Sequence, residues 1–373
     1  MPLERDTWSH AIEAGWHRFD AALEALALGV TDAAERLRAA RDGARRPTDA
    51  LEVVGRRAGQ LRSDLGTIAD LGRGRVAWID ASGKSTALGS SPVDLSGMLR
   101  ERVFESVPAV VLTSATLTSG GAPSDERSDD GQRRPAGPFA YLRSRVGLAG
   151  SALDVTELVV PSPFDFERRA LLYLAGDLPP PRDPAFLAAA AARAAELIDV
   201  VGGGAFVLTT SLASMRALGR ELRARCKDRR IAVQGDAPKA AQLGAFRGAG
   251  DAVLVATLGF WEGVDVPGDA LRLVILEKVP FAVPSDPIVR ARVEAITAEG
   301  GNAFLDYQVP AAAIALKQGF GRLIRTRDDR GIVALFDSRV AERGYGERLL
   351  GALPPARRAT TLAEVREFWS AAG

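Results

Sequence analysis

A glutamine and two arginines near residue 320 form the pattern that points most directly to phosphate chemistry. Residues 318–325 read QGFGRLIR. On one continuous helix, Gln318, Arg322 and Arg325 follow one another at steps of four and three residues, so they are expected to project from one face. Arginine suits phosphate because its guanidinium stays charged and forks around phosphate oxygens, although an isolated exposed arginine is usually only solvated. The spacing therefore predicts a phosphate-binding helix face.

A second polar segment, TLGFWEGVDVPG at residues 257–268, directly follows an apolar run. It contains an aromatic pair, the two acids Glu262 and Asp265, and three glycines. Such a segment fits a hydrophobic core poorly, because a buried carboxylate costs about several kcal/mol unless it is partnered. It predicts a functional turn, and an ordinary surface turn is the alternative.

Small hydroxyl side chains stand where apolar runs end. Thr209 and Ser211 close the run AFVLTTS, and Thr257 closes DAVLVAT. At the carboxyl ends of parallel strands, next to the start of a helix, such side chains suit contact with a phosphate backbone. A simple helix cap by Ser211 is equally compatible with the pattern.

The segment SGKST at residues 82–86 looks like the end of a phosphate-binding P-loop but has the wrong spacing. A P-loop needs a glycine five positions before Gly83, at a turn from a strand into a helix. Position 78 is Trp78, and the following sequence TALGSSPVD is not an apolar helix. A hairpin turn between two strands is the better interpretation.

Taken in order along the chain, these segments resemble the later motifs of superfamily 2 helicases of the DinG/XPD type. TSATL at 113–117 resembles motif III, SPFD at 162–165 a short family signature, and VLTTS at 207–211 motif IV. Residues 257–268 resemble motif V, and QGFGRLIR matches the Q-x-x-G-R-x-x-R pattern of motif VI. The resemblance covers about residues 76–345.

This resemblance implies roles for individual residues. Catalytic roles toward a nucleotide fall on Gln318, Arg322 and Arg325, nucleotide-binding roles on Glu262, Gly263 and Asp265, and nucleic-acid contacts on Thr113, Ser114, Thr209, Ser211 and Thr257. The implied cofactors are ATP and Mg²⁺, held mainly by a first motor lobe whose P-loop lysine and magnesium-binding acids are not found in this sequence. The implied partners are single-stranded or partly duplex DNA and a polypeptide that carries this first lobe.

The elements that must position these residues form a regular alternation. From about residue 185, helical and strand-like runs alternate as far as GIVALFD, which is typical of a parallel sheet covered by helices on both faces. The predicted fold class is α/β, with a RecA-like second helicase lobe over residues 139–373. A helical region is expected over 1–75, with helices over 4–28, from Asp32 and over 48–71. The remaining strands of a first lobe are expected over 76–118, with PAVVLTSATL as a buried strand, and a flexible loop over 119–138.

Composition sets further limits. Lys plus Arg number 48 against 47 Asp plus Glu, so the net charge of +1 gives no whole-chain reason to bind nucleic acid. The single cysteine, Cys226, excludes an internal disulfide and an iron–sulfur cluster held by four thiolates of this chain alone. No apolar amino-terminal segment or run near 18 apolar residues is present, so we expect a cytoplasmic protein that does not enter a membrane.

Three functions remain in competition. In the first, the chain is half of an ATP-dependent DNA helicase or translocase used in DNA repair, inactive until a first lobe joins it. In the second, it is a non-catalytic remnant that binds nucleic acid or regulates another protein. In the third, which the spacing disfavours, it is an independent NTPase that uses Gly83, Lys84 and Ser85.

Overall fold

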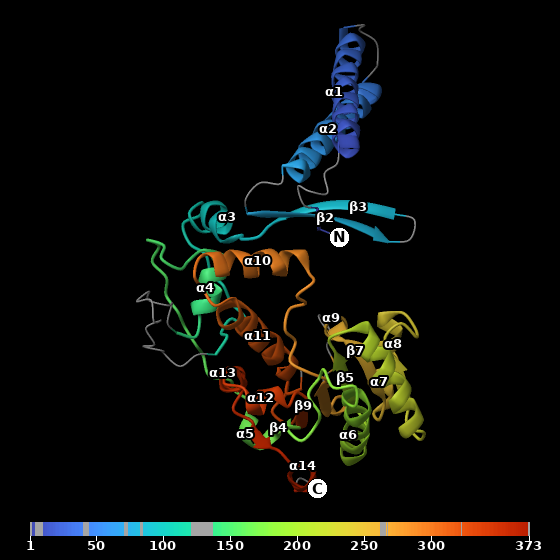
Figure 1. The fold of residues 1–373 in the computed structure, drawn as a ribbon, viewed down its shortest axis with the longest axis vertical. Helices are drawn as coiled ribbons and strands as arrows, with labels where there is room; N and C mark the ends of the chain where they lie inside the picture. The colour runs from blue at the N-terminus through green and yellow to red at the C-terminus, as the bar shows by residue number, and fades with distance from the viewer. Residues whose placement is uncertain are drawn as a thin grey trace. The chain divides into compact units, whose positions relative to one another are not determined.

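The chain folds into two compact units. The computed structural model describes residues 2–3, 10–39, 45–70, 74–82, 85–120, 137–261, 266, 268–321 and 323–371. The first unit combines residues 1–95 with residues 283–299, and the second combines 96–282 with 300–373 (Figure 1). The division predicted from the sequence, at residues 75, 118 and 138, stays a prediction.

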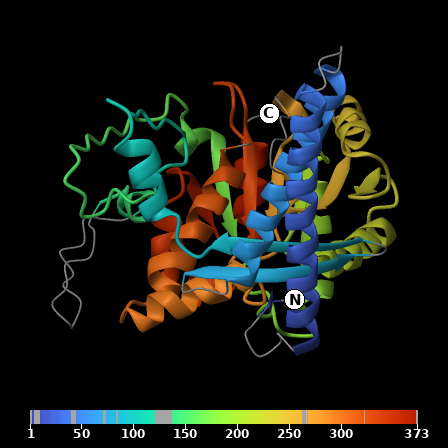
Figure 2. The ribbon, with the colours of Figure 1, turned by 90° about the horizontal axis from the view of Figure 1, so that it is seen from above.

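The first unit consists of a helical hairpin, a small antiparallel sheet and one helix from a distant part of the chain. Its elements are β1 (Pro2–Leu3), α1 (His10–Ala39), α2 (Arg45–Ala69), β2 (Arg75–Ser82), β3 (Ser85–Pro92) and α10 (Pro287–Ala298). Helices α1 and α2 lie side by side (Figures 1 and 2). Arg62 on α2 joins them by pairing with Asp20 and Glu24 on α1.

The prediction of a separate helix from Asp32 is wrong, because α1 runs through this position without a break. The local side chains favour continuation. The Thr31 hydroxyl donates to the Ala27 carbonyl oxygen one turn earlier, and Asp32 forms an ion pair with Arg36 one turn later. Both are interactions between neighbours on one helix face.

The hairpin interpretation of residues 82–86 is confirmed. Strands β2 and β3 pair in antiparallel register from Arg75 opposite Pro92 to Ser82 opposite Ser85. The two residues between Ser82 and Ser85, Gly83 and Lys84, lie outside the described residues. A strand rather than a helix begins at Ser85, so the described flanks of this turn lack the helix amino terminus that a P-loop requires.

Helix α10 is fixed to the first unit by a buried arginine. The Arg292 side chain is only 8% exposed. Its guanidinium donates to the Val93 carbonyl oxygen and lies 3.0 Å from an Asp94 carboxylate oxygen. Asp286 caps the start of this helix by accepting from the backbone N–H groups of Ile288 and Val289.

The second unit is built on a seven-stranded parallel sheet in the order β10-β4-β9-β8-β5-β7-β6. The strands are β4 (Ala170–Leu174), β5 (Ala205–Thr209), β6 (Ile231–Val233), β7 (Val253–Thr257), β8 (Leu273–Leu276), β9 (Gly331–Leu335) and β10 (Arg357–Ala359). The longer helices are α4 (Ala140–Val146), α6 (Phe186–Val201), α7 (Leu212–Arg225), α8 (Lys239–Ala249), α11 (Val309–Phe320), α13 (Tyr345–Gly351) and α14 (Leu362–Ser370). Single turns form α3 (Ser96–Leu99), α5 (Phe166–Arg169), α9 (Leu258–Trp261) and α12 (Arg339–Glu342), with wider or tighter turns at 100–104, 268–270 and 304–308. The predicted α/β class is confirmed.

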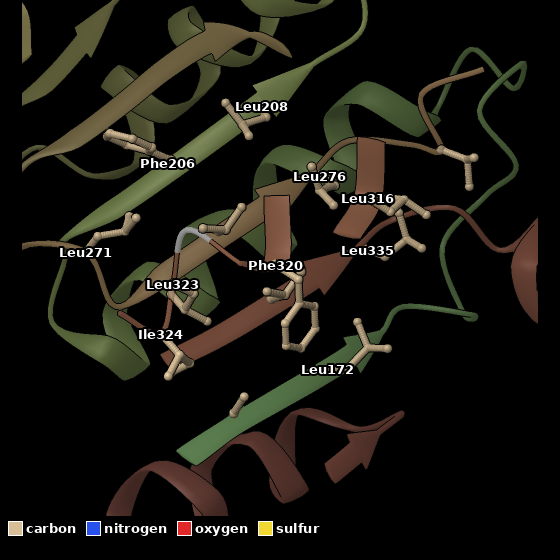
Figure 3. Close-up of a cluster of buried hydrophobic side chains, with 14 of the residues drawn as sticks. Leu172, Phe206, Leu208, Leu271, Leu276, Leu316, Phe320, Leu323, Ile324 and Leu335 are labelled. Carbon is tan, nitrogen blue, oxygen red and sulfur yellow. The ribbon is translucent and has the colours of Figure 1, made fainter. Parts of the chain in front are cut away.

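Helices bury both faces of this sheet, which explains why its inner strands are largely apolar. Successive strand residues point to opposite faces, so Leu171 and Tyr173 face one core, whereas Ala170 and Leu172 face the other. Helices α6, α7 and α14 cover the first face, and α8, α11 and α13 cover the second. Figure 3 shows the second core, where the Phe320 ring lies among leucines from β4, β8 and β9.

One predicted strand is absent. The segment PAVVLTSATL was expected to be a strand buried on both faces, but residues 108–117 have no strand geometry and Val111 is 85% exposed. A strand needs a hydrogen-bonded neighbour, and no described strand pairs with this segment. Residues 158–160, Leu-Val-Val, are exposed in the same way.

The loop expected over 119–138 falls mostly on residues 121–136, which lie outside the described residues. Its two ends meet, because the Ser119 N–H donates to the Pro138 carbonyl oxygen at 3.2 Å. Among the described residues, no helix is long and apolar enough to cross a membrane.

Candidate functional site

The carboxyl ends of the central strands bring two predicted residues together. Thr209 at the end of β5 lies in register opposite Thr257 at the end of β7. The Thr209 side chain is fully buried, and its hydroxyl lies within hydrogen-bonding distance of the carbonyl oxygens of Ser211 (3.0 Å) and Ala256 (3.4 Å). In this conformation Thr209 stabilises the strand end and is not accessible to a polymer.

Thr257 is held by a residue that the sequence did not single out. The Gln234 side-chain oxygen accepts from the Thr257 N–H at 2.9 Å and from its hydroxyl at 3.0 Å. Gln234 directly follows β6, so it occupies the same kind of strand-end position as Thr209 and Thr257. That shared position is the signal by which it could have been found.

Replacing Gln234 by Leu is expected to lower the free energy of unfolding of the second unit by about 1–2 kcal/mol. The substitution removes the acceptor of two partly buried donors on Thr257. Urea denaturation would measure the loss. In a double-mutant cycle with Thr257→Val, the two losses should be less than additive, and strict additivity would contradict the bond.

Ser211 confirms the helix-cap interpretation, which does not exclude a later phosphate contact. Its side-chain oxygen accepts from the Ser214 N–H at 3.1 Å at the start of α7. Next to it, the buried Glu277 carboxylate accepts from the Thr210 N–H at 3.2 Å and lies 3.2 Å from the Lys278 amino group. Glu277 therefore ties the ends of β5 and β8 together, a role that the sequence analysis missed.

Thr113 and Ser114 lie in an exposed segment without regular structure. The Ser114 hydroxyl oxygen accepts from the Thr116 N–H at 3.2 Å, which tightens the local turn. Farther along, the Lys317 amino group donates to the Thr118 hydroxyl at 2.6 Å. Burial lowers the pKa of Lys317. The segment that begins at Thr113 thus ends against α11, one residue before Gln318.

The prediction that Gln318 and Arg325 share one helix face is wrong. Helix α11 ends at Phe320, Gln318 is exposed in its last turn, and Arg325 lies in the following loop. Leu323 and Ile324 are both buried in the core, and burying two consecutive side chains there replaces another helical turn. Arg322 lies outside the described residues.

The buried Asp329 carboxylate fixes the backbone position of Arg325. Asp329 accepts from the backbone N–H groups of Arg325 and Thr326 and from the Thr326 hydroxyl, each at 2.8 Å. Burial lowers the pKa of the Arg325 guanidinium, and the Asp329 charge opposes this effect. Partial burial of the Arg325 guanidinium also weakens solvent screening, so its electrostatic attraction to a neighbouring phosphate would be strong.

Replacing Asp329 by Ala is expected to lower the free energy of unfolding by about 2–4 kcal/mol. Three donors lose a charged acceptor in a site where Asp329 is only 7% exposed. Asp329→Asn keeps a carbonyl acceptor and should lose less. Equal denaturation midpoints for wild type and Asp329→Ala would remove Asp329 from this role.

The nucleotide-binding residues predicted in the 257–268 segment, Glu262, Gly263 and Asp265, lie outside the described residues. Gln318 is exposed in the last turn of α11, and Arg325 is partly buried in the loop that follows this helix. No cluster of three acidic, histidine or cysteine side chains able to hold a metal occurs in the described part of the chain.

Comparison with known proteins identifies the family to which this chain is similar. Residues 194–356 match the helicase C-terminal domain. The chain is 36% identical over 319 residues to the ATP-dependent DNA helicase YoaA of Escherichia coli (strain K12), covering 85% of this chain and 47% of that protein. It is also 36% identical over 299 residues to the ATP-dependent helicase DinG of Mycobacterium tuberculosis (strain ATCC 25618 / H37Rv), covering 79% of this chain and 42% of that protein.

The chain therefore spans less than half the length of these two relatives. A solved XPD helicase structure shares the fold, with a TM-score of 0.53 and 16% identity over 84% of this chain and 54% of that chain. The matched domain, the relatives and the fold agree with the motif order read from the sequence. The chain belongs to the DinG/XPD type of superfamily 2 helicases and carries their helicase C-terminal domain.

Proposed function

We propose that this chain supplies the arginine-bearing second motor lobe of an ATP-dependent DNA helicase or translocase of the DinG type, acting in DNA repair in the cytoplasm. In this proposal a first lobe from elsewhere carries the P-loop and the magnesium-binding acids. Arg322 and Arg325, with Gln318, meet the phosphates of the ATP that this first lobe holds. Single-stranded or partly duplex DNA is the substrate.

The hydrogen bond between Lys317 and Thr118 carries the proposal. It joins the residue directly after the motif III-like segment to the residue directly before the motif VI-like segment, over a separation of 199 residues. In this family, motif III couples the state of the nucleotide to the nucleic-acid track, and a direct contact between the two segments is consistent with such coupling.

The strand ends support the DNA half of the proposal. Thr257 and Ser211 lie at the carboxyl edge of the parallel sheet, where ligands of open α/β sheets bind. The exposed hydroxyls of Thr113 and Ser114 add further hydrogen-bonding groups in the same unit. Such groups recognise a phosphate backbone without reading bases, as a translocating motor requires.

The test combines the purified chain with a first lobe that carries a P-loop. DNA-stimulated ATP hydrolysis and strand separation are expected only from the mixture, because each part holds half of the catalytic groups. A reading frame directly upstream that encodes a P-loop would identify that lobe. Stable association and DNA binding without hydrolysis would instead support a regulatory remnant.

A further inference from the structure

An open hollow of about 390 Å³ lies beside α7, in the second unit. Its charged and polar lining comes from α7 and from the turn after β6, and consists of Arg216, Arg220, Arg223, Gln234 and Asp236. The three arginines follow one another at steps of four and three residues, so one face of α7 presents them together. Helix α7 is labelled in Figure 1.

The charges around this hollow are not balanced. The Arg223 guanidinium pairs with Asp236 and also donates to the Ile231 carbonyl oxygen at 3.3 Å. Arg216 and Arg220 are exposed and have no hydrogen bond or ion pair with any other described residue. Like charges one helical turn apart destabilise a helix by about 0.2–0.5 kcal/mol, so this face carries a small cost that an anion would relieve.

Asp236 does not cancel this positive charge. Its carboxylate accepts from the Val233 N–H at 2.8 Å and from Arg223, so one arginine and one backbone dipole already neutralise it. Farther along the helix, Arg225 pairs with Glu221. Two guanidinium groups therefore face the hollow with their charge uncompensated by the described residues.

Gln234 connects this hollow to the candidate nucleic-acid residues. It lines the hollow and at the same time accepts both hydrogen bonds from Thr257. A DNA strand that contacts Thr257 would therefore be separated from the arginines only by the Gln234 side chain. Planar guanidinium groups bind phosphate oxygens bidentately, which suits them to the repeating phosphates of a nucleic-acid backbone.

We propose that Arg216 and Arg220 form a phosphate-binding site for the backbone of single-stranded DNA, beyond the strand-end residues. This proposal rests on the proposed function, because it extends the same nucleic-acid track. Each arginine neutralises about one phosphate and releases its counterions. The site holds the strand without reading its sequence.

The test measures the affinity of the full chain for a labelled oligothymidylate over a series of salt concentrations. For Arg216→Ala/Arg220→Ala, the slope of log affinity against log salt should become shallower by about 1.4, since each lost phosphate contact on a single strand changes it by about 0.7. Affinity should then fall roughly 25-fold at about 0.1 M salt. Arg216→Lys/Arg220→Lys should keep most of the slope, because lysine retains the charge.

A matched control removes two arginines at the opposite edge of the sheet. Arg358 on β10 and Arg366 on α14 are both exposed, and their double alanine variant changes the net charge equally. Its salt slope should equal that of the wild type. If the Arg216/Arg220 variant matches this control while the wild type binds DNA, the phosphate site is overturned and the proposed function stands.

Two further outcomes are decisive. Failure of the wild-type chain to bind oligothymidylate would overturn both this site and the DNA track on which it rests. Inorganic tripolyphosphate serves as the second probe. Binding of tripolyphosphate that depends on Arg216 and Arg220, with unchanged DNA affinity, would assign the hollow to a soluble polyphosphate and overturn the DNA proposal.

Discussion

Replacing Arg325 by Ala is expected to lower DNA-stimulated ATP hydrolysis of the assembled motor by a factor of about 10³–10⁵. Arginines that reach a transferring phosphoryl group contribute about this much, equivalent to about 4–7 kcal/mol of activation free energy. Asp329 fixes the Arg325 backbone, and partial burial reduces the screening of its charge. The measurement is ATP hydrolysis by this chain combined with its first lobe, with and without DNA.

Arg327 provides the matched control for this variant. It is exposed in the same loop, and Arg327→Ala should leave hydrolysis near the wild-type rate. For both variants the thermal midpoint should stay within about 2 °C, because losing one surface charge usually changes stability by no more than about 0.5 kcal/mol. Near-normal hydrolysis by Arg325→Ala would remove Arg325 from the site, whereas a large fall in the midpoint would make it a structural residue.

The purified chain alone is expected to show no DNA-stimulated ATP hydrolysis above background. Ser82 pairs with Ser85 at the ends of the antiparallel strands β2 and β3, and a strand follows Ser85, whereas a phosphate cradle needs a helix amino terminus there. Without the cradle and the magnesium ligands, the barrier that a P-loop NTPase lowers stays high.

Lys84→Ala distinguishes the possible results of that measurement. A residual rate that survives Lys84→Ala would indicate a contaminating ATPase. A rate that disappears with Lys84→Ala would contradict the hairpin interpretation and restore this segment as a nucleotide site. Adding the first lobe to the same preparation should produce hydrolysis, which shows that the chain was competent.

The alternation of apolar runs predicted the sheet well because every central strand is buried on both faces. The same physics limited the prediction of β4, which lies between β10 and β9. Strand β4 is a five-residue apolar run, and such short runs cannot be distinguished from other buried segments by periodicity. The strand predicted over residues 108–117 was wrong for the opposite reason. The composition of this segment suits a strand, but a strand also needs a neighbour, which composition does not supply.

The candidate site was predictable in its residues but not in its geometry. Thr209 and Thr257 follow from strand ends, yet the bonds that bury one and hold the other come from Ala256 and Gln234. The helical spacing of Gln318 and Arg325 was misleading, because the buried Asp329 organises a loop after α11. Such contacts depend on tertiary packing, which overrides local spacing.

Because α10 belongs to the first unit, this unit can be completed only late in the synthesis of the protein. The first unit is complete only when Arg292 reaches Val93, which was translated 199 residues earlier. At ribosomal rates of about 5–20 residues per second, the amino-terminal hairpin and sheet wait roughly 10–40 s for their last helix. During that interval the nascent chain must keep the Val93 carbonyl and the Asp94 carboxylate hydrated, so amino-terminal fragments that stop before residue 283 should stay partly open on the ribosome and after release.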